Sequence, residues 1–207
     1  MLHYETIEPE ALELLKGLLS FELFRNLRLV GGTSLALQKG HRKSIDLDLF
    51  GNIDVHVLEI NHALSQFGKI TQLKDSMNIH VYLINGLKVD IVNYTYPWLS
   101  DVITEDGIRL AKCEDIAAMK LSAITGRGTK KDFIDLYFLL KEWTLSQILQ
   151  FYQHKFQDGS LFLVMKSLVY FEDAENDAMP DMLMGVDWKE VKETIRQAHK
   201  EYIKNQG

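Results

Sequence analysis

One short stretch of the chain alternates apolar and polar side chains, a pattern that indicates a half-buried β-strand. Asp46 and Asp48 occupy alternate positions of the run Ile45–Phe50, which stops at Gly51-Asn52. Because successive side chains of a strand point to opposite faces, both aspartates are expected on one face. The chain therefore needs a sheet with one apolar face and one face that carries carboxylates.

Helical patterns surround this strand. Apolar residues at helical spacing predict helices over Glu8–Ser20 and Val55–Phe67. The short apolar run Leu27–Val30 predicts a strand that leads into a glycine turn and then a helix over Ser34–Lys39, ended by Gly40.

Three more runs are rich in strand-forming residues, and two of them are joined by Asn85-Gly86, a strong hairpin signal. The hairpin makes Leu87–Ile91 a central antiparallel strand. The predicted strands cover Ile70–Leu73, Ile79–Ile84 and Leu87–Tyr94.

From Cys113 onward the pattern is helical, and no strand is expected. The sequence thus predicts an α+β protein, with an α/β half over residues 1–110, a short mixed or antiparallel sheet flanked by helices, and a helical bundle over residues 111–207. The acidic stretch Glu172–Asp181 is expected to be a solvated loop. The predicted helices cover Cys113–Thr125, Lys130–Lys141, Leu145–His154, Leu161–Phe171 and Trp188–Ile203.

Charge and composition exclude several classes of function. Lys and Arg total 23 against 29 Asp and Glu, so the net charge of -6 disfavours a sequence-independent nucleic-acid coat or a binder of anionic membranes. The single cysteine, Cys113, has no partner for an internal disulfide. The first residues lack the pattern of a secretion signal, and no apolar run approaches the roughly 20 residues of a membrane helix. We expect a cytoplasmic protein without a membrane partner.

A third aspartate, Asp90, interrupts the apolar strand Lys88–Val92. If this strand lies beside that of Asp46 and Asp48, three carboxylates share one sheet face, as in a two-metal phosphoryl-transfer site. Mg²⁺ prefers such oxygen ligands and completes its shell with water or substrate phosphates. Two alternatives remain: Asp46 and Asp48 belong to a solvated strand face, and Asp90 forms a salt bridge with a neighbour.

Two nearby motifs suit a phosphate group. Gly31-Gly32 followed by Thr33 and Ser34 opens a helix, whose first N–H groups can bind an anion. The alternative is an ordinary tight turn with Thr33 and Ser34 as helix caps. The basic run His41-Arg42-Lys43 has two interpretations. It binds a triphosphate or the acceptor RNA, or it is simply a solvated loop.

Taken in order, these motifs resemble the AbiEii-type nucleotidyltransferase toxin family of bacterial toxin-antitoxin and phage-defence systems, within the DNA polymerase β nucleotidyltransferase superfamily. The resemblance extends from about residue 28 to 192. It rests on Gly31–Leu37, His41–Phe50, Lys88–Ile91, Met119–Gly128, Lys131–Tyr137, Pro180–Leu183 and Val186–Trp188.

The resemblance implies a nucleotidyltransferase core over residues 1–110, a C-terminal helical region over 111–207 packed on that core, and transfer of a nucleoside monophosphate from an NTP to an acceptor hydroxyl. It implies Mg²⁺ or Mn²⁺ as cofactor, tRNA or another host molecule as acceptor, and a cognate antitoxin as partner. The alternative is a non-catalytic nucleotidyltransferase-like protein that acts through RNA or a protein partner. Loss of a carboxylate would mark such a protein, and all three are present.

The resemblance also assigns roles to residues. Asp46, Asp48 and Asp90 would bind the metals, while Lys120 and Arg127 would face the nucleotide phosphates. Asp132 would line the cleft as a further catalytic residue, and Asp135 belongs to the same acidic motif. Lys131 stands where the family often has arginine, which keeps the charge but loses bidentate geometry. The nucleotide-binding set would be Gly31, Gly32, Thr33, Ser34, Arg42, Lys43 and Lys120.

Structural alternatives exist for these downstream residues. Thr129 and Asp132 have capping-box spacing, and Lys131 and Asp135 have the spacing of a surface ion pair on a helix. Lys120 and Arg127 are seven residues apart and share a helix face only if the helix extends that far.

Overall fold

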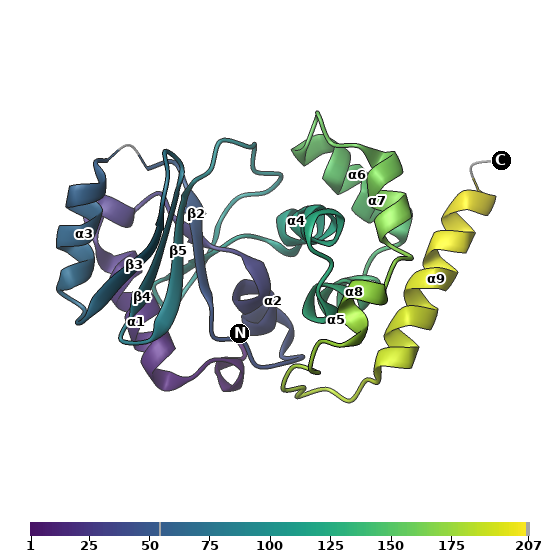
Figure 1. Ribbon diagram of the computed structural model, residues 1–207, viewed down its shortest axis with the longest axis horizontal. Helices are drawn as coiled ribbons and strands as arrows, with labels where there is room; N and C mark the ends of the chain where they lie inside the picture. The colour runs from purple at the N-terminus through teal and green to yellow at the C-terminus, as the bar shows by residue number, and fades with distance from the viewer. Residues whose placement is uncertain (54, 206–207) are drawn as a thin grey trace. The chain divides into compact units, whose positions relative to one another are not determined.

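The computed structural model describes residues 1–53 and 55–205, which form two compact units. The first unit contains Met1–Tyr96 and Asp101–Ala111, and the second contains Pro97–Ser100 and the chain from Lys112 onward (Figure 1). The grouping of Pro97–Ser100 with the second unit was not predicted from the sequence.

The first unit is built on a mixed sheet that has seven strands among the described residues, in the order β3-β4-β5-β2-β1-β7-β6. The pairs β2–β5 and β1–β7 are parallel, and the other neighbours are antiparallel. The predicted α+β class with a mixed sheet is therefore confirmed. The strands are β1 (Arg28–Leu29), β2 (Leu47–Gly51), β3 (Ile70–Asp75), β4 (Ile79–Ile84), β5 (Leu87–Asn93), β6 (Ile103–Glu105) and β7 (Ile108–Leu110).

Two of the hairpins of this sheet turn at residues with positive φ angles. Asn85 and Gly86, with φ of 51° and 88°, join β4 to β5 as predicted. Asp106 and Gly107, with φ of 51° and 78°, join β6 to β7 in the same way. The second hairpin was not predicted, because strands of three residues are too short to show an alternating pattern.

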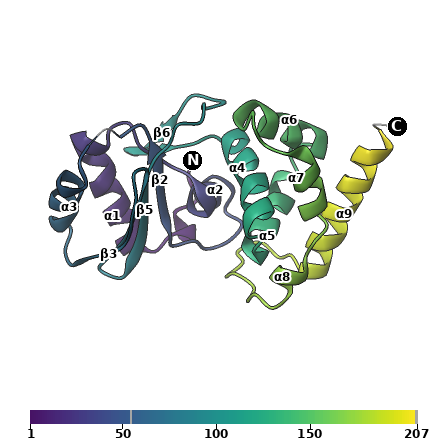
Figure 2. The ribbon, with the colours of Figure 1, turned by 45° about the horizontal axis from the view of Figure 1, so that its top comes forward.

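One face of the sheet packs on two helices. Apolar residues of α1 (Pro9–Ser20) and α3 (Val57–Ser65) form a buried core with inward residues of the central strands, among them Leu47, Leu49, Val89 and Ile91. Helix α2 (Gly31–Lys39) lies on the other side of the sheet in Figures 1 and 2. The 3₁₀ turns Tyr4–Thr6 and Glu22–Phe24 complete the unit.

The second unit is helical. No helix in the described ranges is both long enough and apolar enough to cross a membrane. Its helices are α4 (Cys113–Gly126), α5 (Lys130–Leu139), α6 (Leu145–Lys155), α7 (Leu161–Ser167), α8 (Glu172–Glu175) and α9 (Trp188–Lys204).

The acidic stretch Glu172–Asp181 is mostly exposed, as expected of a solvated loop, but its first four residues form a short helix. It contains α8, and its Glu175 accepts hydrogen bonds from the indole of Trp188 and the ammonium of Lys192 in α9. Asp177 accepts a hydrogen bond from the backbone N–H of Lys130 (2.9 Å), at the start of α5. These hydrogen bonds hold the stretch against α5 and α9.

A fully buried ion pair organises this unit. Lys155 Nζ of α6 lies 2.7 Å from Asp115 Oδ1 of α4, and neither side chain is exposed. The same ammonium donates to the Pro97 carbonyl (2.9 Å), while the Asp115 carboxylate accepts from the backbone N–H groups of Leu99 and Ser100. The ion pair therefore holds Pro97–Ser100 against the helices, which explains why this segment groups with them.

We predict that Lys155→Met lowers the free energy of unfolding by about 3–5 kcal/mol, because it leaves the Asp115 carboxylate buried without its cation. Urea denaturation followed by circular dichroism measures this. Lys189→Met is the matched control, since Lys189 is 82% exposed and its Nζ lies 3.8 Å from Glu193. We expect the control to change stability by less than about 0.5 kcal/mol. Equal effects of the two substitutions would contradict the structural role of the buried pair.

Candidate active site

Two of the predicted site aspartates lie side by side in the sheet. Strand β2 runs parallel to β5, and the register pairs Asp48 directly with Asp90. Both side chains are half-buried and alternate with buried core residues, so they project from the face opposite α1 and α3. Neighbouring strands are about 4.8 Å apart, which brings the two carboxylates close together. Asp46, also half-buried, comes one residue before β2 begins.

A lysine that sequence reasoning did not single out lies among these carboxylates. Lys88 Nζ is 2.7 Å from Asp90 Oδ1, so the salt bridge weighed as an alternative for Asp90 is present. Burial alone lowers the pKa of the Lys88 ammonium. Its close contact with Asp90 and the negative charges of all three aspartates outweigh burial and raise that pKa above its usual value. The sequence did contain a signal for this contact: Lys88 and Asp90 are two residues apart in one strand, which places both side chains on the same face.

The glycine turn lies directly against the Asp48 carboxylate. Helix α2 begins at Gly31, immediately after β1, and Gly31 has a φ of +68°. A Cβ atom at Gly31 would lie 2.2 Å from Asp48 Oδ2, so any side chain there would displace the Asp48 carboxylate. The backbone N–H of Val30 also donates to the Asp48 carbonyl (2.8 Å). The start of the helix, including Gly32, is thus held against the carboxylate-bearing strand.

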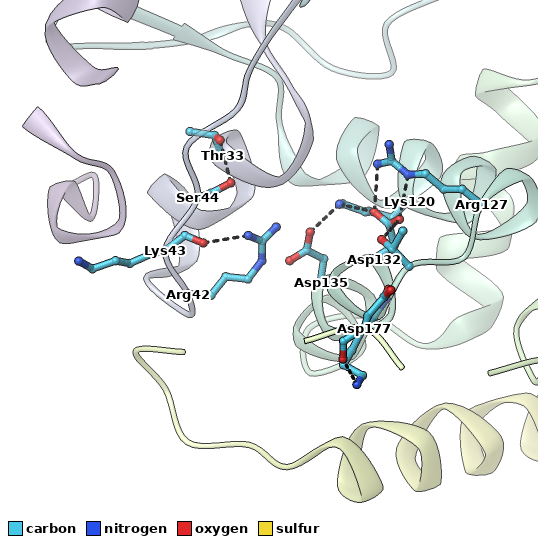
Figure 3. Close-up of polar contacts among 11 residues, drawn as sticks. Thr33, Arg42, Lys43, Ser44, Lys120, Arg127, Asp132, Asp135 and Asp177 are labelled. Atoms are coloured by element: carbon cyan, nitrogen blue, oxygen red, sulfur yellow. Dashed lines mark hydrogen bonds and ion pairs between the residues drawn. The ribbon is translucent and has the colours of Figure 1, made fainter. Parts of the chain in front are cut away.

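Thr33 and Ser34 lie inside the first turn of α2 and do not cap it, because the N-cap position is Val30. Both are buried. The Thr33 hydroxyl donates to the Asp46 carbonyl (2.5 Å) and lies 2.8 Å from the Ser44 hydroxyl (Figure 3). Ser34 Oγ accepts from the amide of Gln38 (3.2 Å). In this structure the two hydroxyls therefore make internal hydrogen bonds.

The basic run before β2 is not a solvated loop as a whole. His41 and Arg42 are buried, and Arg42 Nη1 donates to the Lys43 carbonyl (2.9 Å; Figure 3). Lys43 is more exposed, and its Nζ lies 3.1 Å from a carboxylate oxygen of Glu8. Of the three residues, only Lys43 is exposed enough to match the alternative of a solvated loop.

The carboxylates have the chemistry that a hard divalent cation requires. Asp48 and Asp90 offer oxygen atoms from adjacent strands in register, and Asp46 precedes them on the chain. In the described ranges, no three His, Cys, Asp or Glu side chains are gathered closely enough to hold a metal ion by themselves. The set fits a metal whose remaining ligands are water and substrate phosphate, the arrangement that Mg²⁺ commonly adopts.

The motif residues that follow the sheet in the sequence, from Lys120 to Asp135, form a buried charge cluster in the second unit. Lys120 Nζ of α4 lies 2.9 Å from Asp132 Oδ1 and 2.5 Å from Asp135 Oδ2 of α5. Arg127 Nε lies 3.1 Å from Asp132 Oδ2 (Figure 3). The Thr129 hydroxyl also donates to Asp132 Oδ2 (2.6 Å). Both carboxylates are fully buried, whereas the Arg127 side chain is 62% exposed. The cluster brings together Lys120, Arg127, Asp132 and Asp135.

This geometry excludes the capping box and the surface ion pair that were weighed for the motif. Thr129 bonds the Asp132 side chain and accepts no hydrogen bond from the helix backbone, so no capping box forms. Asp135 is buried, so it is not part of a surface ion pair. Helix α4 ends at Gly126, and Arg127 reaches Asp132 from the following turn.

The cluster sets the ionisation of Asp132. Burial alone raises the pKa of the Asp132 carboxyl. The charge of Lys120, the hydrogen bond from Thr129 and the guanidinium of Arg127 outweigh burial and lower that pKa to about 2. Asp132 therefore carries its negative charge at neutral pH.

The family model for "Nucleotidyl transferase AbiEii toxin, Type IV TA system" matches residues 13–204. This chain belongs to the AbiEii nucleotidyl transferase toxin family. An uncharacterized protein of Aquifex aeolicus (strain VF5) is 33% identical over 205 residues, covering 96% of this chain and 98% of that protein. The resemblance stated from the motifs is therefore confirmed.

Solved structures share the fold of this AbiEii chain. JHP933 from Helicobacter pylori has a TM-score of 0.55 at 22% identity, covering 97% of this chain and 96% of that one. MenT4, a nucleotidyltransferase toxin from Mycobacterium tuberculosis H37Rv, has a TM-score of 0.57 at 15% identity, covering 92% and 82% respectively. The fold of the AbiEii chain is thus that of a nucleotidyltransferase.

We predict that Gly31→Ala destabilises the protein more than Gly107→Ala does. Both positions have positive φ, which costs about 1–2 kcal/mol with a side chain, but a Cβ at Gly107 would meet no atom within 4 Å. Only Gly31→Ala also collides with Asp48, at a further cost of about 1–3 kcal/mol. Urea denaturation in the Asp48→Ala background should abolish that extra cost. An extra cost that persists without the Asp48 carboxylate would refute the contact.

We also predict a pH-dependent contribution from Asp132. Its folded-state pKa of about 2 lies below the ordinary 3.8, so the stabilisation is complete above the unfolded pKa and is lost as the pH falls towards 2. A shift of this size corresponds to about 2 kcal/mol. The stability difference between wild type and Asp132→Asn should shrink by that amount from pH 6 to pH 2. Parallel stability curves for the two proteins over this range would contradict the prediction.

Proposed function

We propose that this protein transfers a nucleoside monophosphate from an NTP to an acceptor hydroxyl and releases pyrophosphate, with Mg²⁺ as the cofactor and Mn²⁺ as a substitute. The observation that carries the proposal is the register of Asp48 with Asp90 beside the glycine turn of α2. An AbiEii-family chain with this arrangement has carboxylates for a metal next to helix N–H groups for a phosphate.

Asp46, Asp48 and Asp90 would hold the metal. When bound, the metal supplies charge neutralisation on the triphosphate and lowers the pKa of the attacking hydroxyl. The first turn of α2, with Gly31 and Gly32, directs its backbone donors at the triphosphate. A carboxylate oxygen of Asp90 is the proposed acceptor for the proton of the attacking hydroxyl.

The charge cluster of the second unit is proposed to act on the leaving group. Lys120 and Arg127 would stabilise the negative charge that develops on pyrophosphate. Arg127 suits this role because its side chain is 62% exposed although its Nε is held 3.1 Å from Asp132. Asp132, ionised at neutral pH, would position both cations, and Asp135 would hold Lys120 from the other side. Arg42 and Lys43 complete the proposed nucleotide contacts.

The acceptor is proposed to be tRNA or another host molecule in the cytoplasm, and a cognate antitoxin is the expected partner, as the type IV toxin-antitoxin family implies. A net charge of -6 requires any RNA to be recognised by a local basic patch. Lys130 and Lys131 form a basic pair at the start of α5. Lys130 cannot belong to such a patch, because it is buried and donates to the Glu175 and Asp177 carbonyls.

The test is incubation of the purified protein with each labelled NTP, Mg²⁺ and total bacterial RNA. We predict that one NTP labels the RNA and that Asp46→Ala and Asp48→Ala each lower the rate at least about 100-fold, since each removes charge stabilisation from the reacting centre. Asp101→Ala, at an exposed aspartate of the same unit, is the matched control and should retain activity.

Each other outcome has a clear meaning. Magnesium-dependent NTP binding that requires Asp46, without label in RNA, would redirect the search to a protein or small-molecule acceptor. An active, metal-dependent Asp48→Ala protein would contradict the proposed site. Absence of any nucleotide binding would support the non-catalytic alternative.

A further inference from the structure

Lys88 occupies a position that the proposed reaction does not use. It lies on β5 two residues before Asp90, on the same sheet face, and its ammonium is 2.7 Å from Asp90 Oδ1. The same strand β5 is in register with β2, where Asp48 pairs with Asp90. The charges of Asp46 and Asp48 also act on the Lys88 ammonium, which therefore lies near all three carboxylates assigned to the metal.

Electrostatics explain why a cation is needed there. Asp48 and Asp90 are half-buried neighbours of like charge, and like charges at that separation repel strongly when solvent screening is reduced. The Lys88 ammonium offsets this repulsion in the chain without metal. Its side chain is 40% exposed, so it has room to move without disrupting the core.

The ammonium and a metal ion would both be attracted to the Asp90 carboxylate. A carboxylate can bind a cation at either oxygen, and the ammonium held 2.7 Å from Oδ1 would repel a divalent cation bound to the same group. The two cations therefore oppose one another at Asp90.

We propose that Lys88 is a built-in counter-ion that competes with the divalent cation for Asp90 and so sets the metal affinity of the site. While Lys88 stays beside Asp90, its positive charge weakens the binding of a metal to that carboxylate. Without nucleotide, this competition keeps metal binding weak; the oxygen ligands of an NTP shift the balance towards the metal. The proposal rests on the proposed function, because it assumes that Asp90 is a metal ligand.

The experiment measures Mn²⁺ binding to the metal-free protein by electron paramagnetic resonance, without nucleotide. Lys88→Met keeps an unbranched side chain of nearly the same length and removes its charge; it should tighten Mn²⁺ binding about tenfold or more. Lys88→Arg keeps the charge and should stay within about threefold of wild type. The metal-free Lys88→Met protein should also melt at a lower temperature than wild type, with the difference reduced by Mn²⁺.

Two results separate this proposal from the proposed function. Asp90→Asn should lose Mn²⁺ binding; if it does so but Lys88→Met binds no more tightly than wild type, competition by Lys88 is overturned while the metal site stands. Mn²⁺ binding that Asp90→Asn leaves unchanged, or no binding even with NTP, would overturn the metal site itself. If Lys88→Met does not fold without metal, refolding in Mn²⁺ should recover it, and failure to recover would count against the counter-ion role.

Discussion

Charges taken out of water must be paired with opposite charges, and this constraint organises both units of the protein. Asp115 and Lys155 are fully buried and pair at 2.7 Å, and together they hold Pro97–Ser100 against the helical unit. Lys120 joins Asp132 and Asp135 in the same way between α4 and α5. In the sheet unit, Lys88 pairs with Asp90 on the half-buried face. An unpaired charge at either of the two buried places in the helical unit would cost several kcal/mol.

The sheet topology turns one of these charge sites into a candidate active site. Strand β5 follows β2 only after α3, β3 and β4, yet it returns beside β2 and parallel to it. This return places Asp90 level with Asp48. Gly31 then allows the start of α2 to approach Asp48 more closely than any other residue type would. The resulting arrangement of carboxylates and helix start suits a metal with a phosphate, and belongs to an AbiEii-family chain.

Most of the fold was predictable from local patterns in the sequence. The alternation around Asp48, the Asn85-Gly86 turn and the helical spacing after Cys113 each depend on neighbouring residues, and the structure has the corresponding elements. Strands β6 and β7 were not predicted, because three residues are too few to show an alternating apolar and polar pattern. Asp115 and Lys155 are 40 residues apart in the sequence, so no local pattern could predict that they form a pair.

The candidate site was predictable in its residue types but not in its contacts. The motifs pointed to Lys120, Arg127 and Asp132, which the structure brings into one cluster. The burial of Thr33 and Ser34 and the position of Lys88 depend on how the strands and loops pack, which spacing does not specify.

The most direct test is a crystal structure of the protein with Mn²⁺ and a non-hydrolysable NTP, with the metal located by its anomalous scattering. The account predicts an anomalous peak bound by Asp48 and Asp90, with the triphosphate at the first turn of α2 and Lys88 no longer on Asp90. A nucleotide bound elsewhere, or a metal that contacts neither aspartate, would contradict it.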